Sequence, residues 1–164
     1  MRIIGGTAKG HTIKSPKGVD TRPTLDRVRE SIFNVLAHRG IYGARVLDLF
    51  SGTGAIAIEA LSRGAESAIA VDFRTGKLIR ENATHCRVED RIQIVPRKLS
   101  QLKYFIGDQQ FDYIFSDPPY ENGFIQETID FVVAHNALAD DGVLVLEHHK
   151  DEAFTMPLEW ECIK

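Results

Sequence analysis

The chain has 164 residues and a mass of 18.4 kDa, which is the size of a single domain. Its composition, with 43% hydrophobic residues, 26% charged residues and a mean hydropathy of -0.16, is that of a soluble globular protein. No apolar run approaches the roughly 18 residues that a bilayer span needs, and no apolar block with a cleavage site begins the sequence. These features disfavour a membrane or secreted protein, and we expect a cytoplasmic monomer.

Charge is distributed unevenly along the chain. Residues 1–30 carry seven basic and three acidic side chains, a balance of +4; since the whole chain carries -3, the remaining residues carry -7. A basic segment on an acidic body is typical of local contact with a polyanion such as nucleic acid, although a solvated charged surface is an equally good explanation. The seven basic residues are Arg2, Lys9, Lys14, Lys17, Arg22, Arg27 and Arg29.

The N-terminal part predicts a β-hairpin followed by one amphipathic helix. Two short strands, residues 2–5 and 12–14, flank a turn that contains glycine. Pro23 and Thr24 mark a helix start, with Thr24 as the candidate N-cap. Apolar residues then recur at helical spacing, namely Leu25, Val28, Ile32, Val35 and Leu36.

From residue 44 onward, short apolar strands alternate with helices. The turn Asp140-Asp141-Gly142 precedes the fifth of these strands, and a sixth is expected around residues 160–163. Such alternation implies right-handed crossovers and a parallel sheet covered on both faces, so the predicted fold is α/β, doubly wound and Rossmann-like. The expected strands are residues 45–50, 68–71, 92–95, 111–115 and 143–147, and the expected helices are residues 55–63, 75–86, 99–105 and 124–135.

Two segments at the carboxyl ends of the first two strands predict a nucleotide-type cofactor site. Gly52 and Gly54 let the backbone turn tightly against a ligand, and Asp48 places a carboxylate nearby. Asp72 ends the second strand and is suited to accept hydrogen bonds from ribose hydroxyls. Because the pattern Gly52-x-Gly54-x-x-Ala57 also fits the dinucleotide fingerprint, NAD remains an alternative at this point, as does a purely structural turn.

The run Asp117-Pro118-Pro119-Tyr120, directly after the fourth strand, favours chemistry on an amine. The exocyclic amine of a nucleobase is a poor nucleophile because its lone pair is delocalised into the ring. The Asp117 carboxylate and the Pro118 carbonyl can accept its two N–H groups and direct the lone pair towards an electrophile. Tyr120 offers a face on which an extruded base can stack. The alternative is a structural role, in which the run is a proline-rich loop that caps a strand and takes no part in catalysis.

These segments together resemble class I S-adenosylmethionine-dependent methyltransferases that act on amino nitrogen. Longer runs resemble the bacterial 16S rRNA (guanine-N2)-methyltransferase family across nearly the whole chain. They are Arg2-Ile3-Ile4-Gly5-Gly6, Thr21-Arg22-Pro23-Thr24, the runs at residues 27–36, 47–55 and 58–65, and Asn82. The resemblance implies methyl transfer to the N2 amine of one guanine in 16S rRNA within the small ribosomal subunit or its assembly intermediate.

The resemblance also implies roles for individual residues, with no metal required. Asp117 and Pro118 would bind the target amine, and Tyr120 would stack the guanine. The cofactor S-adenosylmethionine would be bound by Asp48, Ser51, Gly52, Thr53, Gly54 and Asp72. RNA phosphates would be bound by Lys9, Lys14, Arg22, Arg27 and Arg29. Residues 1–40 would thus form a basic RNA-binding appendage, and residues 41–164 the methyltransferase domain.

The sequence departs from the family at two places. Lys98 follows the third strand where the family commonly has Asp or Asn to meet the adenine amino group, and Lys98 cannot accept a hydrogen bond. The C-terminal strand that usually completes the sheet is also missing from the predicted elements. Two other functions stay open: an amino-methyltransferase acting on adenine N6 or protein glutamine, and a catalytically silent RNA-binding assembly factor.

Overall fold

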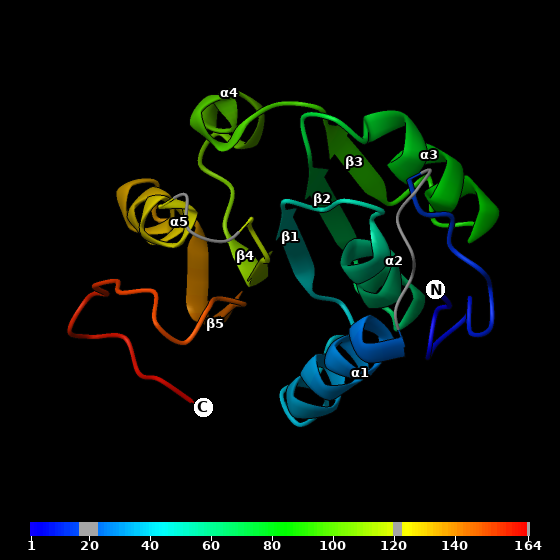
Figure 1. Ribbon diagram of the computed structural model, residues 1–164, viewed down its shortest axis with the longest axis horizontal. Helices are drawn as coiled ribbons and strands as arrows, with labels where there is room; N and C mark the ends of the chain where they lie inside the picture. The colour runs from blue at the N-terminus through cyan, green and yellow to red at the C-terminus, as the bar shows by residue number, and fades with distance from the viewer. Residues whose placement is uncertain (17–22, 120–122, 164) are drawn as a thin grey trace.

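The computed structural model describes residues 1–16, 23–119 and 123–163 of the chain. Its centre is a parallel sheet with the strand order β3-β2-β1-β4-β5 (Figure 1). The strands are β1 (Arg45–Leu49), β2 (Ser67–Val71), β3 (Ile92–Val95), β4 (Phe111–Ser116) and β5 (Leu138–Leu146). The α/β prediction is confirmed, and the bounds of β3 are those expected from the sequence.

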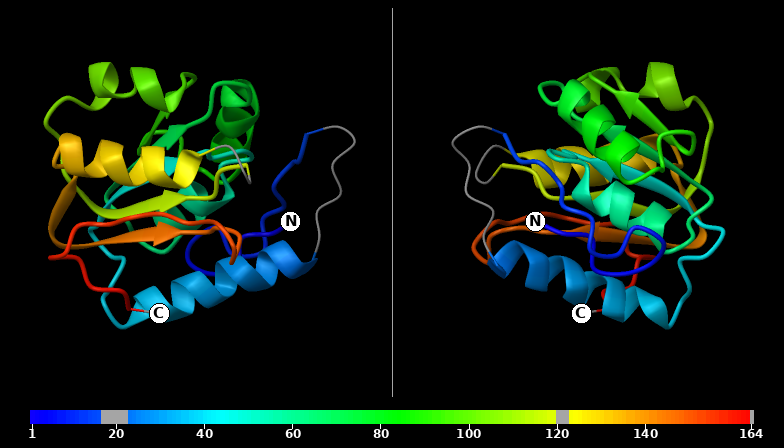
Figure 2. Two further views of the ribbon diagram at one scale, coloured as in Figure 1. Left: turned by 60° about the vertical axis from the view of Figure 1, so that its left-hand side comes forward. Right: turned by 90° about the vertical axis from the view of Figure 1, so that its right-hand side faces the viewer.

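Helices cover both faces of the sheet, as the doubly wound prediction requires (Figures 1 and 2). Val46 of β1 packs into the core beneath α1, α2 and α3, whereas its neighbour Leu47 packs into the core beneath α4 and α5. This alternation is why β1 reads as a continuous apolar strand. The helices are α1 (Pro23–Ala37), α2 (Ala55–Ser62), α3 (Gly76–His85), the 3-10 turn η1 (Leu99–Gln101), α4 (Lys103–Ile106) and α5 (Phe124–Ala134).

The N-terminal segment, residues 1–16, belongs to the same core as the sheet. The expected hairpin is present as one antiparallel bridge between Arg2 and Thr12, and Ile3 and Ile13 are buried with residues of α1 and α2. Glu59 of α2 is fully buried and accepts the backbone N–H groups of Ile4 and Gly5, each at 2.9 Å. The N-terminal segment is therefore fixed against the helix that follows the glycine-rich turn.

Three local predictions need correction. Helix α1 begins at Pro23, so Thr24 lies inside the helix rather than at its N-cap. The turn predicted at residues 140–142 lies within β5, where the pairing with β4 jumps from Phe111 opposite Leu138 to Tyr113 opposite Val143. The extra residues are accommodated by an irregularity inside the strand rather than by a loop before it.

The predicted sixth strand is also wrong. No residue of the described segment 147–163 belongs to a strand. Trp160 packs against the core, but Leu158 and Ile163 are exposed, so this segment lacks the alternating burial that a paired strand shows. In the described residues the last strand of the sheet is β5, at its edge.

Candidate active site

The site lies where the chain reverses its direction of winding across the sheet. Strands β1 and β4 are neighbours, and the loops that follow them run to helices on opposite faces (Figure 1). A parallel sheet opens a crevice at such a point. A cavity of about 250 Å³ is found there, lined by residues from the loop after β1, the ends of β4 and β5, helix α1 and Met1.

Asp48 is the buried acid of this cavity. Its side chain is 3% exposed, and its Oδ2 accepts hydrogen bonds from Ser51 Oγ at 2.7 Å and from the backbone N–H of Ala57 at 3.2 Å. Burial outweighs these two bonds and raises the pKa of Asp48 to about 7. A carboxyl held in this way is poised to stabilise a cationic group that enters the cavity, such as an ammonium.

Gly52 and Gly54, in the turn after β1, have different structural roles. Gly52 has a φ of +60°, and a Cβ built there would meet nothing within 4 Å, so its backbone faces open space where a ligand can approach. Gly54 has a φ of +84°, but a Cβ there would lie 3.0 Å from Ile79 Cγ2 of α3. Gly54 is therefore needed for the close packing of α2 against α3, whereas Gly52 leaves space for a ligand to approach the backbone.

Asp72 stabilises the same turn from the end of β2. Its Oδ2 accepts the backbone N–H of Gly52 at 3.0 Å, and its Oδ1 accepts those of Arg74 at 2.9 Å and Thr75 at 3.2 Å. A carboxylate has about four acceptor positions, so these three bonds leave room for one more donor, such as a ribose hydroxyl. Asp72 thus links the geometry of the glycine turn to the place where a cofactor ribose is expected.

Next to Asp72 lies an exposed aromatic and cationic pair. Phe73 is 50% exposed, and Lys98 Nζ lies 5.3 Å from the centroid of its ring. Lys98, which departs from the family pattern, therefore lies over the Phe73 ring beside the expected nucleoside position. Its ammonium can make a cation–π contact with an aromatic ring there, but it cannot accept a hydrogen bond.

Asp117 reaches the cavity from the end of β4. Its carboxyl is hydrogen-bonded to that of Glu147, the residue that follows β5, and both side chains line the cavity together with Asp48. Asp117 is exposed as a residue, but partial burial of its carboxyl and the neighbouring charge of Glu147 raise the pKa of Asp117 to about 6. Pro118 is buried directly after it, whereas Tyr120 lies outside the described residues.

Asn82 of α3 joins the cofactor turn to the N-terminal segment, although no role was predicted for it. Its side chain is 1% exposed. Its Oδ1 accepts the N–H of Lys14 at 2.9 Å, and its Nδ2 donates to the carbonyls of Lys14 at 3.0 Å and Thr53 at 2.9 Å. The position of the expected RNA-binding segment is therefore coupled to the turn that carries Thr53.

The basic residues expected to bind phosphates fall into two groups. Lys9, Lys14 and Arg27 are exposed. Arg29 must be corrected, because its side chain is 3% exposed and forms ion pairs with Glu59 at 3.2 Å and Asp26 at 3.3 Å. An internal guanidinium with these partners is not available to phosphates. Arg22 lies outside the described residues.

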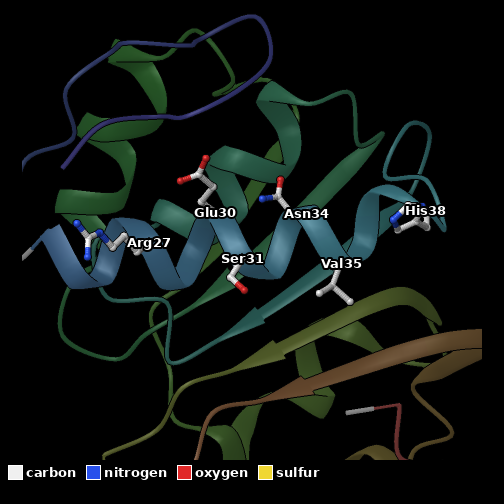
Figure 3. A pocket seen from close by; sticks show the side chains of 6 residues that line it. All are labelled: Arg27, Glu30, Ser31, Asn34, Val35 and His38. Atoms are coloured by element: carbon white, nitrogen blue, oxygen red, sulfur yellow. The ribbon is translucent and has the colours of Figure 1, made fainter.

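Figure 3 shows the outward side of α1, where Arg27 stands at one end and His38 at the other. Between them, Glu30, Asn34 and Val35 line a shallow depression together with Ser31. This surface is separate from the cavity, which faces α1 through Val28, Arg29 and Ile32.

The described residues lack both a metal-binding cluster and a membrane-spanning helix. No group of three or more His, Cys, Asp and Glu side chains there is arranged to hold a metal ion. Among the helices of the described segments, none is both long and apolar enough to cross a membrane.

The residues present fit S-adenosylmethionine. The glycine turn is open at Gly52, a buried carboxyl lies on one side of it at Asp48, and Asp72 on the other side keeps a free acceptor position. These groups match the ammonium of the methionine part and the ribose hydroxyls of S-adenosylmethionine. The fold and the site define a class I S-adenosylmethionine-dependent methyltransferase.

Comparison with known proteins gives the particular family. The whole chain, residues 1–164, matches the family described as Conserved hypothetical protein 95, and the chain belongs to it. The putative rRNA methyltransferase YlbH of Bacillus subtilis is 36% identical over 157 residues, which cover 92% of this chain and 84% of the relative. Ribosomal RNA small subunit methyltransferase D of Escherichia coli K12 is 33% identical over 163 residues, covering 98% and 81%.

Solved structures agree with the fold. The chain is similar to the putative methyltransferase yhhF from Escherichia coli, with a TM-score of 0.88 and 31% identity over all of this chain and 89% of that one. It is also similar to the putative methylase HI0767 from Haemophilus influenzae, with a TM-score of 0.82 and 26% identity over 99% and 89% of the two chains.

Proposed function

We propose that this protein methylates ribosomal RNA of the small subunit, and that its target is the exocyclic N2 amine of a guanine. The observation that carries the proposal is the position of Asp117, whose carboxyl lines the same cavity as Asp48 and Gly52. An acceptor for an amine thus lies beside the expected cofactor position. Relatives named as rRNA methyltransferases support RNA as the substrate.

The chain's own residues have simple tasks in this reaction. S-adenosylmethionine, when bound, supplies a methyl group that is already activated on a sulfonium. Asp117 and the carbonyl of Pro118 accept the two N–H groups of the target amine and turn its lone pair towards the methyl carbon. Phe115 and Val145 line the same cavity as Asp117 and add apolar surface to it.

The exposed basic residues have a role in the same proposal. Lys9, Lys14 and Arg27 would contact RNA phosphates, and residues 1–40 would supply most of the RNA contact, although they share the core of residues 41–164. Tyr120 would stack the extruded guanine.

The test is methyl transfer from methyl-labelled S-adenosylmethionine to small ribosomal subunits from cells that lack the gene. Label is expected in N2-methylguanosine after nucleoside digestion. Asp117→Ala should lower kcat by about 100-fold or more and change cofactor affinity by less than about threefold, because the lost contact is to the amine. Asp72→Ala should do the reverse. Asp108→Ala, which removes an exposed aspartate before β4, is the control.

Three other results would contradict the proposal. Label in N6-methyladenosine or in protein glutamine would identify another amine as the substrate. Tight RNA binding without transfer, under conditions in which the cofactor binds, would support a silent assembly factor. An equal loss of cofactor affinity in both Asp variants would contradict the separate roles of Asp72 and Asp117.

A further inference from the structure

Asp117 and Glu147 hold equivalent places on two adjacent strands. Strands β4 and β5 pair in parallel with Ser116 opposite Leu146, so Asp117 and Glu147 are the next residues along each strand. The N–H of Glu147 donates to the carbonyl of Ser116 at 2.9 Å, which extends the pairing by one step. Both side chains line the cavity, and their carboxyl groups are hydrogen-bonded to each other.

Two carboxyl groups can share a hydrogen bond only when one of them carries a proton, because an ionised carboxylate has no donor. The surroundings favour that state. Asp48 of β1 adds a third acid to the cavity lining, and the guanidinium of Arg29, which reaches the cavity from α1, is already paired with Glu59 and Asp26. Met1 is the remaining contribution of the N-terminal segment to this lining. Met1 carries the α-ammonium of the chain, and none of the ion pairs seen among the described residues joins that group to Asp117 or Glu147.

We propose that Asp117 and Glu147 form a carboxyl pair that holds one proton, and that Glu147 is a positioning residue through which Asp117 takes up the proton released by the methylated amine. The inference rests on the proposed function. It adds Glu147, which lies outside both the glycine turn and the proline loop, to the residues of the site.

The amine nitrogen forms a bond to the methyl carbon while the carbon–sulfur bond breaks, and that electron pair stays on sulfur to give a thioether. The nitrogen then carries a positive charge and one proton too many. That proton passes to the ionised member of the carboxyl pair, which becomes neutral and returns a proton to water before the next turnover.

Glu147→Gln separates this role from a merely structural one. Glutamine keeps the size and the hydrogen bond of Glu147 but cannot carry the shared proton. Its amide donates to Asp117, so Asp117 should ionise at lower pH and be a weaker proton acceptor. We expect the acidic limb of the kcat profile to move down by about one pH unit and the plateau to fall about tenfold, with cofactor affinity unchanged. Glu159→Gln, at an exposed glutamate near the C-terminal end, is the matched control.

A second measurement does not depend on activity. Carboxyl ¹³C resonances of Asp117 and Glu147 in the protein alone should titrate together in two steps, and Glu147→Gln should leave Asp117 with one step at lower pH. Independent titration of the two carboxyls, or an Asp117 titration that Glu147→Gln does not move, would overturn the pair. A fall in kcat with an unmoved acidic limb would overturn the proton role.

The two proposals can fail separately. Coupled titration in a protein that transfers no methyl group to any RNA would refute the proposed function and the relay, while the shared proton would stand. Methyl transfer to guanine with uncoupled carboxyls would refute the pair and leave the proposed function intact.

Discussion

Arg29 and Glu59 form an ion pair inside the protein, with 3.2 Å between Arg29 Nε and Glu59 Oε1 and side-chain exposures of 3% and 0%. Glu59 also accepts the N–H groups of Ile4 and Gly5, and the guanidinium of Arg29 donates to the carbonyl of Arg2. The pair therefore joins α1, α2 and the N-terminal segment. Arg63 Nε is the fourth donor to Glu59, at 2.9 Å, so the buried carboxylate is paired with two cations. Removing one of them leaves the buried charge only partly compensated.

Arg29→Ala should consequently reduce stability rather than RNA contact. Its loss removes one of the two cations paired with Glu59 and the bond to the carbonyl of Arg2, while Arg63 stays in place, so we expect the free energy of unfolding to fall by about 2 kcal/mol. Arg27→Ala, two residues earlier on the exposed side of α1, should change it by less than about 0.5 kcal/mol but lower the salt dependence of RNA binding by about one phosphate contact. Urea unfolding and binding at several salt concentrations measure the two effects. A reduced salt slope in a fully folded Arg29→Ala protein would restore the phosphate role.

Asn82→Ala should loosen the N-terminal segment from the cofactor turn. The substitution removes three hydrogen bonds of a buried amide to Lys14 and Thr53, so we expect a loss of about 1–3 kcal/mol in unfolding free energy and faster amide hydrogen exchange at Lys14. Glu81→Ala, an exposed neighbour on α3, is the control. Equal exchange at Lys14 in both variants would show that Asn82 does not hold the segment.

Two glycines of the N-terminal turn provide a matched test of packing. Gly6 and Gly10 have φ values of +80° and +86°. A Cβ at Gly6 would lie 1.8 Å from the carbonyl oxygen of Ser62, whereas one at Gly10 would meet nothing within 4 Å. Gly10→Ala should cost about 1 kcal/mol from backbone strain alone, and Gly6→Ala should cost at least about 2 kcal/mol more because the segment must move off α2. Similar urea midpoints for both variants would contradict this packing.

Most of the fold could be predicted because its signals are local. Each strand is a short apolar run, and each helix follows at the expected distance, so the alternation alone indicates a parallel sheet. The failures occurred where tertiary contacts decide. The turn residues 140–142 favour a loop, and they lie within β5 at the irregularity between Leu138 and Val143, two positions that pair with β4, where Asp141 has a φ of +61°. Residues 160–163 were expected to form a strand, yet they are not part of any strand in the described residues.

In the candidate site, too, local signals could be predicted from the sequence and tertiary contacts could not. Asp72 and Asp117 could be predicted because each directly follows a buried strand, and Asp48 because it lies one residue before the end of β1, which places all three near the ligand-binding edge. Glu147 gave the same signal at the end of the fifth expected strand, but its pairing with Asp117 could not be predicted, because only the register of β4 with β5 brings together two carboxyls that are 30 positions apart. The burial of Arg29 was missed for a similar reason, because Glu59 lies on another helix.

Asp48 should make the protein less stable as the pH rises towards neutrality. Its pKa is about 7 in the folded protein against 3.8 for an unperturbed carboxyl. Between these values the folded state keeps a proton that the unfolded chain releases, so raising the pH favours unfolding over this interval. Asp48→Asn removes the titration while its amide oxygen can still accept from Ser51 and Ala57. We expect the decline in unfolding free energy between pH 4 and pH 7 to become shallower by a few kcal/mol.

The measurement is urea unfolding at several pH values, with Asp112→Asn as the control for a carboxylate outside the cavity. Asp112 accepts the N–H of Arg45 at 2.8 Å at the opposite end of the strands, so its replacement should lower stability without flattening the pH dependence. Parallel pH curves for the wild type and Asp48→Asn would mean that Asp48 is already ionised in the folded protein. In that case its charge would have to be stabilised by water in the cavity, and the buried acid would meet the cofactor ammonium as a carboxylate from the start.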